Sequence, residues 1–213
     1  MATDWGRRAD ALSADALAAG QPTAWFDRLY AEADAGSVSL PWNRTDPHPL
    51  LRQWLEERPP ASQGTRAVVV GCGLGADAGH LASLGYDTMA FDISPTAVRL
   101  ASERFPSVRF EVGDLLALPA GWRRAFDLVV EIHTLQAVPD PPRSDMLAGV
   151  AALVADGGTL LTVQLRDDGS VPAGAGPPFA LAGDQLLQLA SHGLELVRLE
   201  SLDGPLWRAE FGR

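Results

Sequence analysis

Three glycines, Gly71, Gly73 and Gly75, follow a short apolar run in the first half of the chain. Small residues at this spacing are typical of a sharp strand-to-helix turn at which a ligand approaches the backbone. A second apolar run ends in Asp92, whose carboxylate can accept hydrogen bonds from ribose hydroxyl groups. The pattern predicts a site for a nucleotide-like cofactor, and both NAD and S-adenosylmethionine fit it.

Three further features favour S-adenosylmethionine over a dinucleotide. Gly113 and Asp114 end another apolar run, one strand–helix–strand step after Asp92, where an acid can accept a hydrogen bond from the adenine amino group. The chain ends in a predicted helix and hairpin, as expected of a methyltransferase sheet. Little length is left for the separate substrate domain that a dehydrogenase usually has. The predicted cofactor-binding residues are therefore Gly71, Cys72, Gly73, Gly75, Asp92, Ile93, Gly113, Asp114, Leu115 and Glu131.

Two ionisable residues, Glu131 and His133, follow the fourth predicted strand, where ligands of open α/β sheets bind. Methyl transfer from a sulfonium is an in-line displacement, which needs alignment, exclusion of water and sometimes removal of a proton. His133 has a suitable pKa for a general base. Glu131 is the second catalytic candidate, and it can instead hold the cofactor's ammonium group or the substrate. The alternatives are that Glu131 accepts hydrogen bonds from nearby backbone and that His133 only lines a pocket wall.

The chain has one cysteine, Cys72, and it stands inside the glycine loop. A helix start favours the thiolate form, but a small residue beneath the cofactor also explains its presence. The four histidines are scattered and have no metal-ligand spacing among themselves or with Cys72. We expect no metal site.

A regular alternation of strands and helices must position these residues. Continuous β-branched and apolar runs predict buried strands over 66–70, 87–91, 108–111, 126–132 and 159–165. Helices are expected over 76–84, 95–104 with Ser94 as the cap, and 143–155. The series predicts a parallel sheet that is covered by helices on both faces.

The two ends of the chain differ from this middle part. Apolar stripes predict helices over 10–19, 23–35 and 50–57 at the N-terminal end. A helix over 184–191 and strands over 194–201 and 206–211 are expected at the other end, with Asp-Gly in the intervening turn as the hairpin signal. The Gly- and Pro-rich segment 167–178 is either a mobile loop near the site or a plain linker.

The charge and composition limit the possible partners. The formal net charge of -10 over 213 residues disfavours nucleic acid and an anionic membrane surface. No apolar run approaches the length of a membrane span, and the first residues are too polar for a signal peptide. We expect one cytoplasmic domain that acts on a small molecule as a monomer or homodimer.

Taken together, these motifs resemble the class I S-adenosylmethionine-dependent methyltransferases. The matching residues are the glycine loop, Asp92, Gly113-Asp114, Phe126 to Val129, and Asp156-Gly157-Gly158 before the fifth strand. The resemblance implies an α/β fold, namely a Rossmann-like, doubly wound, seven-stranded, mostly parallel sheet with a C-terminal antiparallel hairpin. It covers the chain from about residue 40 onward.

The thiopurine and thiol/halide methyltransferase branch gives a narrower resemblance. Its signs are the Trp-rich segment before the fold, Gly75-Ala76-Asp77, and the Asp-Ile-Ser-Pro run that starts at Asp92. The family implies that Trp42 packs over the cofactor as part of an N-terminal helical lid. The chain departs from the family at Asn43 and Thr45, where Asp and Gly are frequent.

The resulting hypothesis is S-adenosylmethionine-dependent methylation of a small molecule, with sulfur as the first acceptor atom and nitrogen or oxygen next. Residues 1–60 are expected to form the lid segment, and 61–213 the cofactor-binding domain. Two alternatives remain, a nicotinamide-dependent reductase and a non-catalytic protein that binds S-adenosylmethionine.

Overall fold

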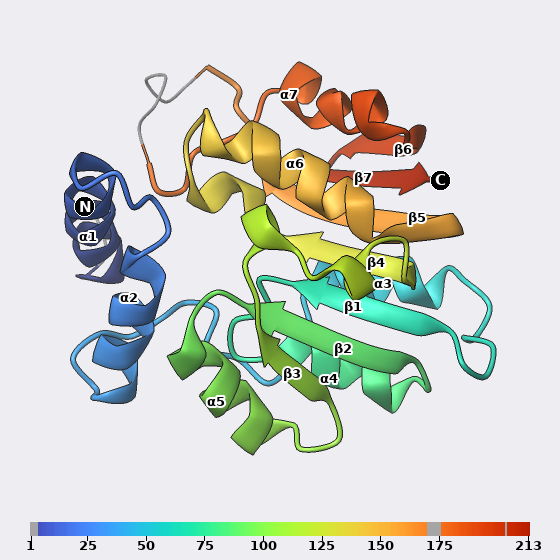
Figure 1. The fold of residues 1–213 in the computed structure, drawn as a ribbon, viewed down its shortest axis with the longest axis horizontal. Helices are drawn as coiled ribbons and strands as arrows, with labels where there is room; N and C mark the ends of the chain where they lie inside the picture. Colours follow the sequence, from blue (N-terminus) through green and yellow to red (C-terminus); the bar gives the residue numbers. More distant parts are fainter. Residues whose placement is uncertain (1–3, 170–175, 203) are drawn as a thin grey trace.

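The computed structural model describes residues 4–169, 176–202 and 204–213. Its centre is a seven-stranded sheet in the order β3-β2-β1-β4-β5-β7-β6 (Figure 1). Strands β1 to β5 are parallel, and β7 pairs antiparallel with β5 and β6, which confirms the predicted mostly parallel sheet with its C-terminal hairpin. The strands are β1 (Arg66–Val70), β2 (Asp87–Asp92), β3 (Arg109–Val112), β4 (Phe126–Ile132), β5 (Val154–Leu165), β6 (Glu195–Ser201) and β7 (Leu206–Gly212).

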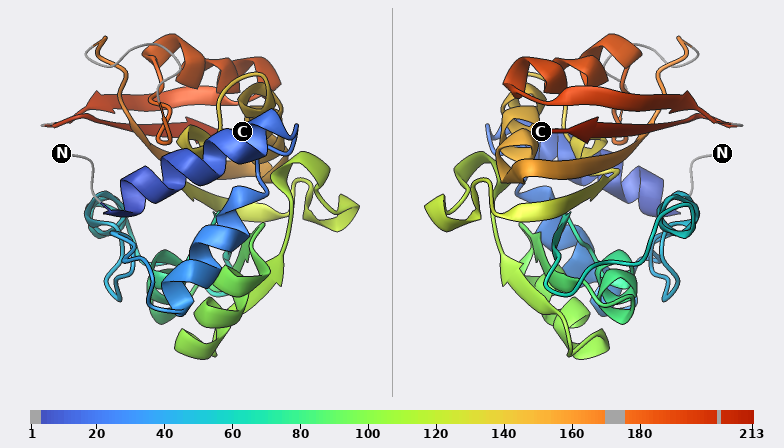
Figure 2. Two further views of the ribbon diagram at one scale, coloured as in Figure 1. Left: turned by 90° about the vertical axis from the view of Figure 1, so that its left-hand side faces the viewer. Right: turned by 90° about the vertical axis from the view of Figure 1, so that its right-hand side faces the viewer.

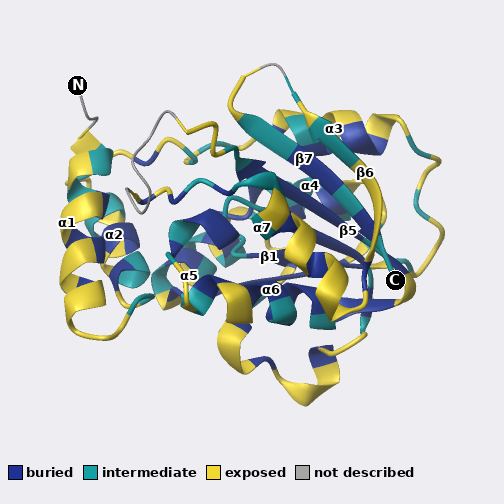
Figure 3. Cartoon of the chain, turned by 90° about the horizontal axis from the view of Figure 1, so that it is seen from above, coloured by how far each residue is buried: buried dark blue, intermediate teal, exposed yellow. Residues whose placement is uncertain are grey.

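Helices cover both faces of this sheet. Leu51 of α3 and Leu81 of α4 are fully buried against one face, and Leu147 of α6 and Leu186 of α7 are buried against the other. Within the described ranges, no helix is both long and apolar enough to cross a membrane. The bounds are α3 (Pro49–Glu56), α4 (Ala76–Ser83), α5 (Pro95–Arg104), α6 (Pro142–Leu153) and α7 (Gly183–Leu187). Figure 3 shows that the central strands are buried while the outer turns of the helices are exposed.

Two N-terminal helices, α1 (Asp4–Ala18) and α2 (Trp25–Asp34), lie at the carboxyl ends of the parallel strands (Figures 1 and 2). They pack on each other through buried Leu12 and Leu29 and on the rest of the molecule through Leu74 and Ala97. The apolar stripes of the two helices therefore form a third, smaller core outside the sheet.

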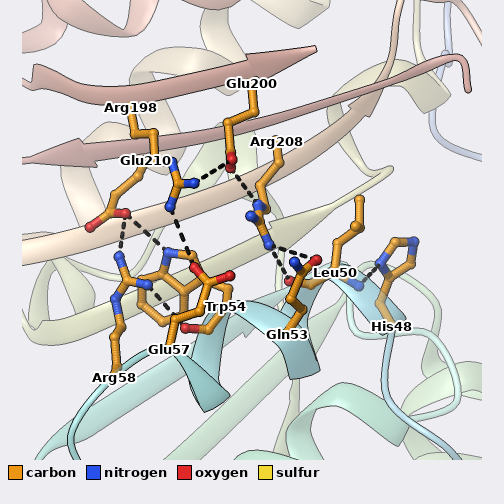
Figure 4. A network of polar contacts seen from close by, with 10 residues as sticks. All are labelled: His48, Leu50, Gln53, Trp54, Glu57, Arg58, Arg198, Glu200, Arg208 and Glu210. Carbon is orange, nitrogen blue, oxygen red and sulfur yellow. Dashed lines mark hydrogen bonds and ion pairs between the residues drawn. The ribbon is translucent and has the colours of Figure 1, made fainter. Parts of the chain in front are cut away.

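A polar network joins α3 to the C-terminal hairpin (Figure 4). Arg208 of β7 is only 2% exposed, and its guanidinium donates hydrogen bonds to Glu200 Oε2 at 2.7 Å and to the Leu50 carbonyl at 3.3 Å. A buried arginine requires such partners. The network fixes α3, whose N-cap residue is His48.

Most predicted elements agree with the structure to within a few residues. Strand β5 begins at Val154, five residues before its predicted start, and three other elements also differ from the prediction. Helix α1 begins at Asp4, six residues before the predicted start, and α6 ends at Leu153 because Val154 already pairs with Phe126 in the sheet. The predicted 184–191 helix divides into α7 and a 3₁₀ segment, Gln188–His192. Asp203 of the predicted hairpin turn and residues 170–175, half of the 167–178 segment, lie outside the described residues.

Candidate functional site

A cavity of about 350 Å³ opens at the carboxyl ends of the parallel strands, against α1 and α2. The strand order reverses between β1 and β4, and ligands of open α/β sheets bind at such a point. The lining comes mainly from the loops after β1 to β4, from the two N-terminal helices and from the 35–48 loop. Met146 of α6, Pro177 and Pro178 complete it. It includes Trp5, Trp25, Phe26, Tyr30, Trp42 and Arg44 on one side, and residues 70–77, Asp92, Ile93, Gly113, Asp114, Leu115 and His133 on the other.

The three glycines form a cradle at one side of this cavity. Gly71, Gly73 and Gly75 have φ angles of +58°, +52° and +86°, in the left-handed region that favours glycine. A Cβ atom on Gly71 would lie 2.2 Å from Thr134 Oγ1, and one on Gly73 would lie 2.8 Å from the Tyr30 hydroxyl. Both the backbone conformation and the close approach of neighbours therefore require glycine here.

Two aspartates end the strands next to the cradle. Asp92, at the end of β2, accepts hydrogen bonds from the backbone N–H groups of Gly73 at 2.9 Å and Ser94 at 3.0 Å. Burial raises the pKa of Asp92, and these bonds oppose the rise. Asp114 follows β3 and accepts from Leu116 N–H at 2.8 Å. Carboxylate oxygens have several acceptor positions, so both side chains keep capacity for a ligand.

His133 lies directly after β4, with a left-handed φ of +63°, and lines the cavity. Its Nδ1 is 3.2 Å from Gln136 Oε1, and that oxygen also accepts from Leu165 N–H at 2.5 Å. Because Gln136 Oε1 is the acceptor, Nδ1 carries the proton and Nε2 keeps the free lone pair. Burial lowers the pKa of His133, and Arg44 adds to this effect while Gln136 opposes it. The imidazole is therefore neutral at pH 7, with a basic nitrogen.

Glu131 has a different position from the one expected for it, since its side chain is fully buried and does not line the cavity. Its carboxylate accepts hydrogen bonds from the backbone N–H groups of Thr134 at 2.8 Å and Leu135 at 3.0 Å, and from Thr162 and Gln164. Burial raises the pKa of Glu131, and these four donors oppose the rise. The acceptor capacity of the carboxylate is thus used inside the protein, which agrees with the alternative that Glu131 accepts hydrogen bonds from nearby backbone.

His48 lies against His133, although the two are far apart in the sequence. Their ring centroids are 5.3 Å apart at an interplanar angle of 72°. His48 is the N-cap of α3, and its Nδ1 accepts from Leu50 N–H at 3.2 Å. Burial, with His133 and Arg44 as smaller causes, lowers the pKa of His48 to about 3. The sequence pattern alone did not indicate this pair of rings.

Aromatic side chains form the opposite side of the cavity, which we call the roof. Trp42 Nε1 donates a hydrogen bond to the Tyr30 hydroxyl at 3.1 Å, and Trp5 meets Trp42 edge-on with ring centroids 5.4 Å apart. Tyr30 approaches the cradle directly, because its hydroxyl is the nearest atom to a Cβ on Gly73. Trp42 thus lies in the cavity wall, and its partner Tyr30 connects the roof to the cradle.

Asp27 of α2 ties the roof to the sheet. It accepts hydrogen bonds from Ser94 Oγ at 2.7 Å and from Thr96 N–H at 2.9 Å, at the N-terminus of α5. Burial acts to raise the pKa of Asp27, but the bonds from Ser94 and Thr96 outweigh it, and the net pKa is lowered. The N-terminus of a helix favours a carboxylate, so this contact is stabilised in the charged form.

Cys72 lines the cavity beneath the roof, and burial raises the pKa of its thiol well above the ordinary value, with Asp92 adding to the rise. The neutral thiol fits the interpretation of Cys72 as a small residue under a ligand. In the part of the chain that the structure describes, no three His, Cys, Asp or Glu side chains gather in a way that could hold a metal ion.

Residues 67–158 match the family model of a methyltransferase domain. This region is fewer than half of the residues of the chain, and it contains the cradle, Asp92, Asp114 and His133. The roof residues lie outside it.

Two curated relatives match the chain over different lengths. The ubiquinone biosynthesis O-methyltransferase of Albidiferax ferrireducens is 30% identical over 116 residues, which are 52% of this chain and 45% of the relative. The probable thiol methyltransferase 2 of Arabidopsis thaliana is 26% identical over 199 residues and covers 84% of each chain. The chain spans about half the length of the ubiquinone biosynthesis relatives that it matches.

A solved structure shares the fold over most of the chain. The N-methyltransferase NodS from Bradyrhizobium japonicum, in complex with S-adenosyl-L-homocysteine, has a TM-score of 0.68 at 21% identity, and the match covers 86% of this chain and 97% of that chain. At this identity the likeness concerns the fold alone. Residues 67–158 therefore match a methyltransferase domain, and the chain as a whole has the Rossmann-like fold of the methyltransferase structures that it resembles.

Proposed function

We propose that this protein is an enzyme that transfers a methyl group from S-adenosylmethionine to a small-molecule acceptor. The observation that carries the proposal is the glycine cradle, which borders a cavity at the strand-order reversal and lies beside the carboxylates that end β2 and β3. The methyltransferase domain over the same residues supports it.

The residues of the cavity fit this cofactor. The cradle leaves the backbone open to a ligand, Asp92 is placed to accept hydrogen bonds from the ribose hydroxyls, and Asp114 from the adenine amino group. Ile93, Gly113 and Leu115 line the wall between them, and Trp42 would cover the bound cofactor. Three aspartates face one arginine among the described lining residues, an excess of acids that suits a cationic sulfonium.

S-Adenosylmethionine supplies an activated methyl group when it is bound, so the chain's own residues must orient the acceptor, exclude water and, where needed, take a proton. The aromatic side chains of the roof would cover the acceptor and exclude water from it. His133 Nε2 is the proton acceptor, because the hydrogen bond from Nδ1 to Gln136 leaves its lone pair free. In this proposal Glu131 is a positioning residue, which holds the turn that carries Thr134 against Gly71.

Sulfur is our first choice of acceptor atom, and nitrogen or oxygen is next. The probable thiol methyltransferase, which aligns along 84% of this chain, supports sulfur. The O-methyltransferase relatives align over about half of the chain and keep oxygen as the alternative. A thiol of modest pKa needs little help from a base, whereas an amine or phenol needs more.

The test uses S-adenosylmethionine with a labelled methyl group and a panel of thiols, amines and phenols. We expect label in at least one thiol. His133→Asn should lower the rates with amines or phenols by about 10²- to 10⁴-fold and the rate with thiols far less. His192→Asn is the matched control, since His192 is exposed and lies outside the lining of the cavity. Binding of S-adenosylmethionine without turnover on any acceptor would instead support a non-catalytic binding protein.

We also propose that α1, α2 and the 35–48 loop, which make up most of the 1–60 segment, act as a lid over the cofactor-binding domain of 61–213. Helix α3, in the same segment, stays fixed on β7 through Arg208. The support is that α1, α2 and the 35–48 loop supply one side of the cavity, while they pack mainly in their own apolar cluster. A lid of this kind would admit ligands when it opens and exclude water when it closes.

A further inference from the structure

Arg44 is the one arginine or lysine among the cavity-lining residues that the structure describes. It belongs to the 35–48 loop, and its side chain is 32% exposed. Its Nη2 lies 3.8 Å from Asp77 Oδ2, which is an ion pair without the short distance of a good hydrogen bond. No side chain in the described ranges accepts a hydrogen bond from this guanidinium, so its donors are available to a ligand.

The backbone that carries Arg44 is held from two directions. Arg104 donates to Asn43 Oδ1 at 2.9 Å and to the Arg44 carbonyl at 3.3 Å. On the other side of the loop, Asp77 Oδ1 accepts from His48 N–H at 2.6 Å. A guanidinium on a fixed backbone loses little freedom on binding, which favours affinity.

Arg44 is also linked by contacts to the candidate base. Its ion-pair partner Asp77 accepts from His48 N–H at 2.6 Å, and the His48 ring lies against His133, so the Arg44 segment joins the cradle side of the cavity to the end of β4. A ligand that spans these two places would pass the guanidinium. Guanidinium groups bind carboxylates in a fork-shaped, charge-assisted geometry.

We propose that Arg44 is the carboxylate-binding residue of this cavity, with Asp77 as the residue that positions it. The proposal rests on the proposed function, because S-adenosylmethionine ends in an α-amino acid whose carboxylate is one possible ligand. The other source of the same chemistry is a carboxylate on the methyl acceptor. With either source, Arg44 would make the cavity prefer ligands that carry a carboxylate.

The first experiment measures binding by titration calorimetry with S-adenosylhomocysteine and with 5′-deoxy-5′-methylthioadenosine, which lacks the amino acid end. If the carboxylate is the cofactor's, Arg44→Gln should weaken S-adenosylhomocysteine by about 10- to 100-fold and leave methylthioadenosine unchanged. Arg44→Lys should recover part of the affinity, because lysine keeps the charge but not the fork. Arg66→Gln is the matched control, since Arg66 also pairs with one aspartate but starts β1 at the far end of the sheet.

The second experiment tests the acceptor as the source. The protein is saturated with S-adenosylhomocysteine and titrated with 2-mercaptobenzoate and with benzenethiol. If Arg44→Gln leaves the cofactor product unaffected but weakens 2-mercaptobenzoate about tenfold or more, with benzenethiol unchanged, the carboxylate belongs to the acceptor.

Two results would overturn the proposal. One is an equal loss of affinity for S-adenosylhomocysteine and methylthioadenosine in Arg44→Gln, which would mean that Arg44 only shapes the loop. The other is that Arg44→Gln changes the affinity of none of the probes. This outcome includes the case in which the wild-type protein does not bind 2-mercaptobenzoate and Arg44→Gln binds S-adenosylhomocysteine as tightly as the wild type. Failure of the wild-type protein to bind S-adenosylhomocysteine at all would refute the proposed function itself. Thermal unfolding of each variant separates these results from loss of the fold.

Discussion

The floor of the cavity is made largely of backbone, whereas the roof is made of side chains. The floor, which we define as the ends of β1 to β4 and the glycine cradle, continues the strands of the sheet. Gly113 N–H donates to the Asp92 carbonyl at 3.0 Å, and Cys72 N–H donates to the Phe91 carbonyl at 3.0 Å. The roof side chains are carried by α1, α2 and the 35–48 loop. This segment contacts the rest of the molecule through a few polar contacts, such as those of Asp27 with Ser94 and of Asn43 with Arg104, and through its apolar cluster.

This difference separates two tasks. A floor of hydrogen-bonded backbone is fixed before any ligand arrives, so it can orient a cofactor without a cost of reorganisation. In the proposed lid, α1, α2 and the 35–48 loop would lift when their polar contacts break, chiefly those of Asp27 with Ser94 and of Arg104 with Asn43. Segments with few anchors open more readily than the core.

Gly71→Ala should have the largest effect, because it breaks the floor. The residue has a φ of +58°, and an added Cβ would lie 2.2 Å from Thr134 Oγ1. We expect a loss of about 2–5 kcal/mol in the free energy of unfolding, from left-handed strain and overpacking together. Urea denaturation measures this loss, and calorimetry should show weaker binding of S-adenosylhomocysteine.

Gly64→Ala is the control for this prediction. Gly64 has a similar φ of +83°, but no described atom lies within 4 Å of its added Cβ. It should cost about 1–2 kcal/mol from strain alone and leave binding of S-adenosylhomocysteine unchanged. Equal losses in the two variants would show that close packing does not fix the floor.

The end of the 35–48 loop, where His48 caps α3, should lose stability in acid. The pKa of His48 is about 3 in the folded protein and near its ordinary 6.5 when unfolded, so the unfolded chain binds the proton more readily between these values. The free energy of unfolding should therefore fall as pH drops from 6.5 toward 3. His48→Asn keeps an N-cap acceptor and should remove up to about 3 kcal/mol of the loss between pH 6.5 and pH 4. Urea denaturation at several pH values, with His192→Asn as control, measures it; identical curves for wild type and His48→Asn would contradict the account.

Asp27→Ala should have the smallest effect, because it loosens the roof alone. It removes the acceptor for Ser94 and Thr96, and the expected cost is about 1–2 kcal/mol. Hydrogen exchange should become faster in α1 and α2 and stay unchanged in β1. Asp34→Ala is the control on the same helix, since Asp34 forms only an exposed pair with Arg99.

The same experiment tests the lid. S-Adenosylhomocysteine should slow exchange before residue 50 in the wild-type protein, and less so in Asp27→Ala. Unchanged exchange in that segment on addition of the ligand would reject the lid.

The floor was more predictable from the sequence than the roof, for a physical reason. The valines of β1 are buried on both faces and therefore form a continuous apolar run, and positive φ angles require glycine at 71, 73 and 75. These are local constraints, and they are visible in the sequence. The end of α6 was misplaced because Val154 pairs with Phe126 in β4, a partner that the local pattern does not show.

Residues that meet only in the folded chain were missed. His48 reaches His133, and Arg44 reaches Asp77, through the packing of α3 and α4, which no spacing rule describes. Glu131, by contrast, was predicted as a site residue, although its side chain does not line the cavity. The prediction arose because a carboxylate at the end of a strand is often a ligand contact, and the sequence does not show whether the protein itself supplies the hydrogen-bond donors. Its four donors, among them Thr162 from the neighbouring strand, become visible only in the structure.

The central claim is that the floor binds S-adenosylmethionine rather than a dinucleotide. Its most direct test is calorimetric titration of the wild-type protein with S-adenosylhomocysteine and, separately, with NAD⁺ and NADH. The account predicts saturable binding of S-adenosylhomocysteine at one site per chain, which Gly71→Ala weakens, and no binding of either nicotinamide nucleotide. Binding of a nicotinamide nucleotide without binding of S-adenosylhomocysteine would contradict it and favour a reductase.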